Sequence, residues 1–419
     1  MRKALFVATA ALALWLAPAA LASGWCGTGE LATDRLDLVT GAQVHTIVAT
    51  PSDSPDLFVA DANKLADDVA SMSAWWTGQD PTRVPRYDVA TFPGGTCLDI
   101  SYVRLPQPAS AYQGESSFDA VVAALENDGF ADTYKDYVVY YDGPSVEVGL
   151  CGQGGGQFNL GGGFAIVWMS GCPDVAEDAI ETHELLHAFG ASFTQSPNDC
   201  PPPNDHHPCD SSLDVLYPFA TPGVPLSQQL LDYNHDDYYA HSGTWPDIQD
   251  AIFLQHLNTP EVALGLTLSG PGLVTSDLPG VACEASCTTQ WDQGTVVTLF
   301  ASPANTSRFL HWTGGCVGPA DCVLTLSQAT SVSAVFGPMT IPVTVSTSGK
   351  GAVACTPKCS KHFSAGDRLM LRAAPAKGWK FVSWGGVCAG TRLTCSPKTD
   401  FALTVRANFK KLLPVKKKR

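Results

Sequence analysis

After residue 22 the chain lacks any long hydrophobic run. No later stretch stays apolar over the roughly 18 residues that a membrane-spanning helix requires. The last segment, residues 409–419, is rich in lysine and lacks a hydrophobic anchor. We therefore expect a released protein with no membrane span.

Lysine and arginine are scarce in most of the chain. Residues 23–260 hold 6 Lys and Arg against 33 Asp and Glu, and residues 261–337 hold 1 against 5. Residues 338–419 reverse the balance, with 16 against 2. This basic segment could attract an anionic envelope polymer, extracellular nucleic acid or an anionic surface. It could equally offset the acidic part and keep the chain in solution. We expect no sequence-specific recognition of nucleic acid.

The first 22 residues have the pattern of a secretory signal. Arg2 and Lys3 form a charged start, residues 4–16 an apolar run, and residues 20–22 a cleavage site of small residues. Such a signal predicts a secreted, extracellular protein.

The cysteine content fits that compartment. Fourteen cysteines, an even number in a secreted chain, predict disulfides rather than free thiols. We favour a Cys200–Cys209 pair, which would close a short proline-rich loop that contains His206 and His207. The other pairings stay open, and a zinc site made of thiolates is the rival use of these residues.

Residues 23–260 are expected to form an α/β domain. The glycine-rich run from 152 to 163 lacks the Gly-Lys-Ser/Thr ending of a phosphate-binding loop, so we interpret it as a mobile loop near a substrate cleft. The apolar patterns predict strands at 44–49, 87–91, 98–103, 137–141 and 164–169, the second and third forming a pair, and helices at 57–76 and 118–125. A further helix, capped by Asp174 and stopped at Gly190, should follow the last strand.

This last helix carries an HExxH motif, made of His183, Glu184 and His187. Residues four apart share one face of a helix, so both imidazoles can reach a single zinc ion. Glu184 lies beside that face, where it can act on a metal-bound water. A catalytic zinc site needs a third protein ligand and keeps its fourth position open. The motif therefore predicts a Zn²⁺ site, with two exposed helical histidines as the alternative.

The extended motif, residues 183–190, reads HExxHxxG and resembles the opening of the metzincin zinc-peptidase signature. That signature would place a third histidine at position 193, where this chain has Phe193. The stretch from 205 to 218 resembles secreted bacterial metzincin-like proteins in which a longer loop carries the third histidine. The resemblance implies His207 as the third ligand, with His206 as its close competitor.

Three further positions bear on this resemblance. Leu216 stands where the metzincin turn has a methionine, which is a packing residue, so leucine is a tolerable exchange. Tyr217 resembles a tyrosine that assists the transition state in some metzincins, although a buried structural tyrosine fits as well. Residues 243–247 match the GTxxD of aspartate-ligated zincins without the Tyr-Gly that should follow, which leaves Asp247 as an alternative ligand. The acidic run 232–241 could bind calcium or, as we favour, hold a loop by hydrogen bonds.

The last 160 or so residues contain an internal repeat with an offset of 72 or 73 residues. We expect two small all-β modules, at 261–337 and 338–410, each with two internal disulfides, and a basic tail at 411–419. They resemble the divergent internalin-B repeats of bacterial secreted and surface proteins. The recurring residues are Cys283, Cys287, Gly294, Ala301, Pro303, Phe309, Trp312, Cys316, Cys322 and Phe336, which return as Cys355, Cys359, Gly366, Ala373, Pro375, Phe381, Trp384, Cys388, Cys395 and Phe409.

Together these features predict a secreted, monomeric zinc peptidase with a zincin-like catalytic domain followed by two β repeats. Its substrate would be a protein or peptide, and Glu184 would be the general base. An alternative is an adhesive or envelope-binding protein, in which the zincin domain is a scaffold and the basic repeat binds a polyanion. A zinc enzyme that hydrolyses another kind of bond is the third hypothesis.

Overall fold

The computed structural model describes residues 25–27, 30–147, 149–191, 194–304, 307–338, 340–356, 362–364, 368–398 and 402–413. The predicted secretory signal lies outside these residues. The chain divides into two compact units, of which the first runs to Glu261 and includes the short pieces 278–281 and 291–293. The second unit contains the remaining C-terminal residues. In the described part of the chain, no helix has the length and apolar character needed to cross a bilayer.

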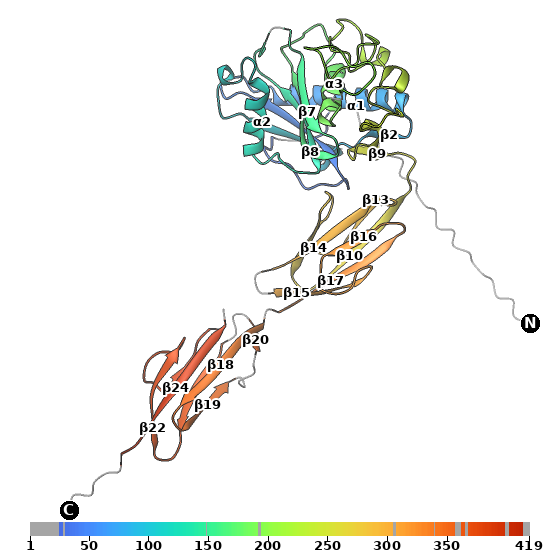
Figure 1. Ribbon diagram of the computed structural model, residues 1–419. Helices are drawn as coiled ribbons and strands as arrows, with labels where there is room; N and C mark the ends of the chain where they lie inside the picture. Colours follow the sequence, from blue (N-terminus) through green and yellow to red (C-terminus); the bar gives the residue numbers. More distant parts are fainter. Residues whose placement is uncertain are drawn as a thin grey trace, which may run out of the picture. The chain divides into compact units, whose positions relative to one another are not determined.

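A five-stranded sheet in the order β5-β1-β6-β8-β7 forms the centre of the first unit (Figure 1). Four strands run parallel: β1 (Gln43–Thr50), β5 (Ile100–Arg104), β6 (Lys135–Tyr141) and β8 (Leu160–Trp168). The edge strand β7 (Gly152–Gln157) pairs with β8 in the antiparallel direction. The glycine-rich run is therefore not the mobile loop that we predicted, because it starts with this strand and continues into β8.

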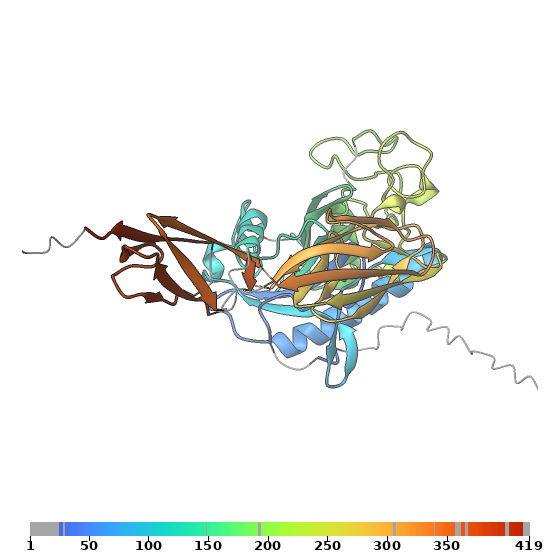
Figure 2. The ribbon, with the colours of Figure 1, turned by 90° about the horizontal axis from the view of Figure 1, so that it is seen from below.

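Helices cover both faces of this sheet. On the central strand β6, Val138 packs with helices α1 (Phe58–Gln79) and α3 (Glu177–Ala188), whereas Val139 packs with α2 (Ser117–Asn127) on the other face. This alternation follows from the two-residue period of a strand, and the continuous apolar sequence of β6 reflects burial on both sides. Figure 2 shows α1 and α2 on opposite sides of the strands.

One predicted strand pair is wrong. Strand β3 (Val89–Phe92) pairs with β4 (Gly95–Leu98) in a tight hairpin, and not with Ile100–Arg104. The latter segment, β5, instead joins the main sheet beside β1, with Ile100 opposite Thr46. The turn at residues 93–94 is short enough to bring the two flanking strands together directly, which leaves β5 free to pair elsewhere.

Most of the chain between α3 and residue 253 forms loops, seen in green to yellow-green in Figure 2. Its only regular elements among the described residues are three short 3-10 helices. Another such helix precedes α2, and a small two-stranded ladder, β2 with β9, completes the unit. Their bounds are η1 (Ala109–Ala111), η2 (Leu226–Gln228), η3 (Tyr233–His235), η4 (Ile248–Asp250), β2 (Arg83–Pro85) and β9 (Leu254–His256).

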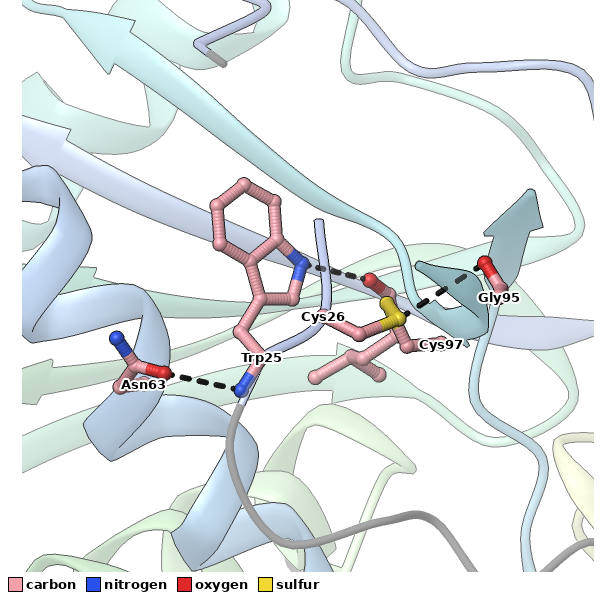
Figure 3. Close-up of a disulfide and its surroundings, with 6 residues drawn as sticks. Trp25, Cys26, Asn63, Gly95 and Cys97 are labelled. Atoms are coloured by element: carbon pink, nitrogen blue, oxygen red, sulfur yellow. Dashed lines mark hydrogen bonds between the residues drawn. A yellow bond between two sulfur atoms is a disulfide. The ribbon is translucent and has the colours of Figure 1, made fainter. Parts of the chain in front are cut away.

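The N-terminal segment is fastened to this unit by a disulfide and by hydrogen bonds (Figure 3). Cys26 pairs with Cys97 on β4. Beside it, the backbone N–H of Trp25 donates to the side-chain oxygen of Asn63 on α1, and its indole N–H donates to the carbonyl of Leu98. Cleavage of the chain after this segment would therefore leave it covalently attached.

The second unit contains two β modules built on the same plan. In each, a first strand pairs in parallel with the last, β10 with β17 and β18 with β24, and the last strand also pairs with an antiparallel neighbour. The strands are β10 (Glu261–Ser269), β11 (Gly272–Ser276), β12 (Ala282–Cys283), β13 (Cys287–Asp292), β14 (Val296–Pro303), β15 (Ser307–Gly314), β16 (Cys322–Thr325), β17 (Thr330–Pro338), β18 (Thr340–Ser348), β19 (Gly351–Thr356), β20 (His362–Ser364), β21 (Met370–Pro375), β22 (Trp379–Gly386), β23 (Thr394–Cys395) and β24 (Leu403–Lys411).

Corresponding features confirm the repeat. A β-bulge interrupts the β15–β17 ladder after Phe309, and another interrupts the β22–β24 ladder after Phe381, 72 residues later. Trp312 and Trp384 are buried in the two cores, so they are packing residues rather than exposed stacking platforms. The described disulfides are Cys283–Cys287 and Cys316–Cys322 in the first module and Cys388–Cys395 in the second. Cys359 lies outside the described residues.

Candidate metal and catalytic site

Helix α3 presents the two histidines of the HExxH motif on one face. It begins at Glu177, with Ala176 at the cap position and no side-chain cap, so the predicted Asp174 cap is wrong. The residues before the helix are held in turns, and Cys172 is tied to Cys151 at the start of β7. The predicted C-terminal stop is correct, because Gly190 has a positive φ of 95° and its N–H donates to the carbonyl of His187.

Backbone carbonyls fix the orientation of both imidazoles. Nδ1 of His183 lies 2.8 Å from the carbonyl oxygen of Val215, and Nδ1 of His187 lies 2.7 Å from that of Ala191. A carbonyl can only accept, so each Nδ1 carries the proton and each Nε2 is left with its lone pair. Metal-binding histidines are commonly oriented in this way.

His207 joins the pair from the loop after α3. One nitrogen from each of His183, His187 and His207 lies within 4.8 Å of the other two. Nε2 of His187 and Nε2 of His207 are 3.1 Å apart. Three imidazole nitrogens that converge in this way form a donor set that suits a zinc ion.

His206 does not belong to this group, although it lines the same cleft. Its backbone has a φ of 74°, in the left-handed region, and its N–H donates to a side-chain oxygen of Asp199. The side chain is about half exposed, with Nε2 3.7 Å from a carboxylate oxygen of Asp205. Of the two neighbouring imidazoles, only that of His207 has a nitrogen within the group formed with His183 and His187.

A disulfide closes the loop that carries His207. Cys200 pairs with Cys209, as predicted, and the N–H of Cys200 donates to the carbonyl of His207 at 2.8 Å. The N–H of Cys209 donates to the carbonyl of Asn198 at 2.8 Å. The loop is thus closed both covalently and by backbone hydrogen bonds, which limits the freedom of the His207 imidazole.

Burial keeps the three imidazoles neutral. It lowers the pKa of His183 to about 4, and the nearby His207 adds to the lowering. Burial also lowers the pKa of His187 far below its usual value, and that of His207 to a smaller extent. Neutral imidazole is the form that binds a metal, so the group needs no deprotonation near neutral pH.

Glu184 is buried beside the histidines, where edge strand β7 passes close to the helix. Burial raises the pKa of the Glu184 carboxyl to about 8. A β-carbon placed on Gly152 would lie 2.6 Å from the carboxylate of Glu184, and one on Gly154 would lie 2.3 Å from its backbone oxygen. The alternating glycines therefore allow the strand to approach α3 so closely.

Glu181 was missed by the sequence interpretation. Its buried carboxylate accepts hydrogen bonds from the hydroxyls of Tyr87 and Tyr140, at 2.7 and 2.9 Å, and so ties α3 to the sheet. Burial raises the pKa of Glu181 to about 8. Its position two residues before His183 was visible in the sequence, but its tyrosine partners come from distant segments.

The three histidines and Glu184 line a cleft of about 860 Å³. Tyr217 also lines it and is half-buried, so both interpretations of this residue stay predictions. Leu216, at the position of the metzincin methionine, is buried in the core next to this turn. The other boundary residues include Phe118, Gln153, Asp174, Asp205 and Phe219.

Two other candidates have structural roles. The side chain of Asp247 accepts from the backbone N–H groups of Gln249 and Ala240, at the start of η4, and does not belong to the histidine group. Asp232 accepts from the backbone N–H groups of four residues, 236–239. Asp232 thus holds a loop by hydrogen bonds, as we favoured, whereas Asp236 and Asp237 lie with Asp210 in a group of carboxylates, so the calcium alternative stays a prediction.

The family model described as "Divergent InlB B-repeat domain" matches residues 275–340 and 341–412. The C-terminal part of the chain thus carries two such repeats. No curated protein matches the chain.

Several solved structures match the chain at low similarity. Wild-type OgpA of Akkermansia muciniphila is 11% identical, with 93% of this chain and 99% of that chain covered and a TM-score of 0.27. Inactive OgpA in complex with an O-glycopeptide substrate, glycodrosocin, is 9% identical over the same shares, with a TM-score of 0.24. The minor pilin GBS52 of Streptococcus agalactiae is 7% identical, covers 38% of this chain and 99% of its own, and has a TM-score of 0.14. Similarities this weak support no inference about the fold or activity of the chain.

Proposed function

We propose that the protein is a secreted zinc peptidase with a zincin-like catalytic domain. The observation that carries this proposal is the convergence of three neutral imidazoles beside a buried carboxylate in an open cleft. His183, His187 and His207 would hold Zn²⁺, which when bound supplies a Lewis acid that acidifies water and polarises a carbonyl group. The disulfides fit an oxidising, extracellular compartment.

Glu184 has the position of a general base. Its carboxylate lies beside the imidazole group and lines the same cleft, so a water molecule there would be within its reach. The carboxylate would accept the proton of the attacking water and return it to the leaving amine. The positive charge of a metal held by the histidines would counteract the effect of burial on its pKa.

Two further features suit a peptide substrate. Strand β7 lies at the edge of its sheet and lines the cleft through residues 152–154, so an extended peptide could pair with its free edge. Tyr217, which also lines the cleft, could donate a hydrogen bond to the oxyanion that develops at the scissile carbonyl.

Digestion of a diverse peptide library tests this proposal. The chain from residue 23 onward and its Glu184→Gln variant, both loaded with zinc, would be compared by mass spectrometry of the products. We expect cleavage by the parent and a rate about 10²- to 10⁴-fold lower for the variant, since the variant lacks the general base. If neither protein cleaves any peptide while both retain zinc, the peptidase proposal is wrong.

A further inference from the structure

One end of the second β module gathers lysines from three separate chain segments. Lys350 lies in the turn before β19, Lys377 in the turn before β22, and Lys380 on β22 itself. Lys410 and Lys411 end β24, so the five side chains come from segments that the fold brings together. All five are exposed. We call this group the lysine end.

Backbone contacts define the lysine end. The N–H of Ala376 donates to the carbonyl of Lys350 at 3.2 Å, which joins the two turns. Lys380 stands directly opposite Lys410 in the β22–β24 ladder, and the N–H of Leu412 donates to the carbonyl of Gly378 at 2.8 Å. The start of β22 and the end of β24 lie at the same end of the module (Figure 1).

The described part of the module places no carboxylate beside the lysine end. Among the described residues, no carboxylate lies within 4.0 Å of any of the five lysines. Like charges directly opposite each other destabilise a β-ladder, so the pair Lys380 and Lys410 should destabilise the β22–β24 ladder. The first module has the same ladder with Arg308 opposite Gly337, so the fold itself does not require a lysine pair at this place.

Exposed aliphatic side chains lie beside these lysines. Leu412 and Leu413 follow Lys411 directly and are 49% and 86% exposed. The sequence then continues with four further basic residues, 416–419. A soluble polyanion would form ion pairs with the lysines but would provide no apolar surface for the leucines to contact. A membrane with anionic lipids offers charged headgroups and hydrocarbon within one surface.

From this combination we infer that the lysine end docks the protein on membranes that contain anionic lipids. The lysines contact the headgroups, and Leu412 and Leu413 enter the boundary between headgroups and acyl chains. A polybasic patch or apolar insertion alone gives only weak membrane attachment, whereas the two together give stable attachment. The inference is independent of the proposed peptidase activity, because it uses none of the residues of the cleft.

Sedimentation with lipid vesicles tests the inference. The chain from residue 23 onward would be mixed with vesicles of phosphatidylcholine alone or of phosphatidylcholine and phosphatidylglycerol in equal parts. Omitting residues 1–22 keeps the hydrophobic signal from contributing. We expect binding only to the vesicles with phosphatidylglycerol, and weaker binding at higher salt.

Variants separate the charge from the apolar contribution. Lys380→Gln with Lys410→Gln should weaken binding about 25-fold, at roughly five-fold for each lysine. Leu412→Ser with Leu413→Ser should weaken it about ten-fold, through lost apolar burial. Arg368→Gln with Lys398→Gln is the matched control. It removes the same charge near the opposite end of β21 and should have a much smaller effect.

Three results would overturn the inference. The first is the absence of binding to phosphatidylglycerol. The second is an equal effect of the two charge-removing pairs, which would indicate nonspecific attraction to a basic module. The third is tight binding of soluble polyphosphate together with vesicle binding that the leucine substitutions do not change, which would identify an anionic polymer as the partner. Thermal unfolding of each variant verifies that the second module still folds.

Discussion

At the scale of single residues, the candidate site depends on which of two adjacent histidines faces helix α3. His207 contributes a nitrogen to the group with His183 and His187, whereas His206 lines the same cleft, is about half exposed and lies outside the group. We expect His207→Ala to weaken zinc binding about a hundred-fold or more, because it removes one of three protein ligands. His206→Ala should change it by less than about two-fold, since exposed side chains rarely matter to a site that they do not touch.

Competition with a chromogenic chelator would give the zinc dissociation constants of both variants. The two substitutions remove the same side chain from neighbouring positions, so each controls for the other. Equal weakening by both, or a larger effect of His206→Ala, would contradict the assignment of His207.

The pair Asp61 and Asp142 predicts a pH-dependent stability. Burial raises the pKa of Asp61 to about 7, and the nearby Asp142 adds to the rise. The usual value is 3.8. A raised carboxyl pKa means that the folded protein binds this proton more tightly than the unfolded chain does. Proton binding by Asp61 therefore stabilises the folded protein at low pH, and this stabilisation is lost as the pH rises toward 7. Asp61→Asn should remove this dependence, because its amide donates to Asp142 at every pH.

We therefore expect Asp61→Asn to stabilise the first unit by about 1–2 kcal/mol at pH 8. The advantage should grow between about pH 4 and pH 7 and then level off. Urea unfolding at several pH values would measure it, with the exposed Glu126→Gln as a control that should show no such trend. A constant difference between Asp61→Asn and the parent over this range would contradict the prediction.

Two ligand candidates of the site could be derived from sequence at this scale, and the third could not. His183 and His187 lie four residues apart on one helix, so their common face follows from local geometry alone. The choice between His206 and His207 depends on the backbone path of their loop, in which His206 has a positive φ, and no residue pattern specified that path. The carbonyl partners at Val215 and Ala191 were equally invisible in the sequence.

At the scale of secondary-structure elements, the contact between β7 and α3 controls the position of Glu184. Gly152→Ala would place a methyl group 2.6 Å from the Glu184 carboxylate, so the carboxylate must move. We expect kcat/KM for peptide cleavage to fall about ten- to hundred-fold, because a displaced general base loses its alignment. Zinc binding should persist, since the atoms nearest to the new methyl group belong to Glu184 and Ile180 and not to an imidazole.

Gly155→Ala provides the control on the same strand. Its added methyl group would meet only the ring of Phe118, at 3.8 Å, so its activity should stay near that of the parent. Comparable activities of Gly152→Ala and Gly155→Ala would mean that the approach of β7 to the helix does not hold Glu184 in place.

The lysine pair of the β22–β24 ladder predicts an unusual gain in stability. Because Lys380 and Lys410 repel each other, Lys410→Gln should stabilise the second module by roughly 0.2–1 kcal/mol. The corresponding first-module substitution, Arg308→Gln, should have a smaller effect, since Arg308 stands opposite Gly337. Calorimetry at low salt would measure both, and a loss of stability in Lys410→Gln would contradict the repulsion.

The order of the helices and parallel strands in the first unit followed from sequence periodicity, but the pairing of the short strands did not. Leu98 and Ile100 read as one apolar run, although Leu98 ends the hairpin strand β4 and Ile100 begins β5 of the main sheet. The glycine-rich run was misread for a related reason. Glycine weakens a strand intrinsically, and only the nearby helix explains why β7 needs residues without side chains.

At the scale of the whole molecule, the organisation was the most predictable feature. A repeat of eight identities at one offset identifies duplicated modules regardless of their fold, and the family match and the matched bulges confirm it. The charge distribution separates an acidic first unit from a basic last module. This division agrees with the two proposals made above, a peptidase site in the first unit and a membrane-docking surface on the last module.

The proposed peptidase activity requires that His183, His187 and His207 hold a metal ion. Elemental analysis by mass spectrometry of the processed protein, purified without added metal or chelator, tests this in one measurement. We predict about one zinc ion per chain, as expected for a single three-histidine site. A protein that is purified fully folded, contains no zinc and takes up none on titration would contradict the account.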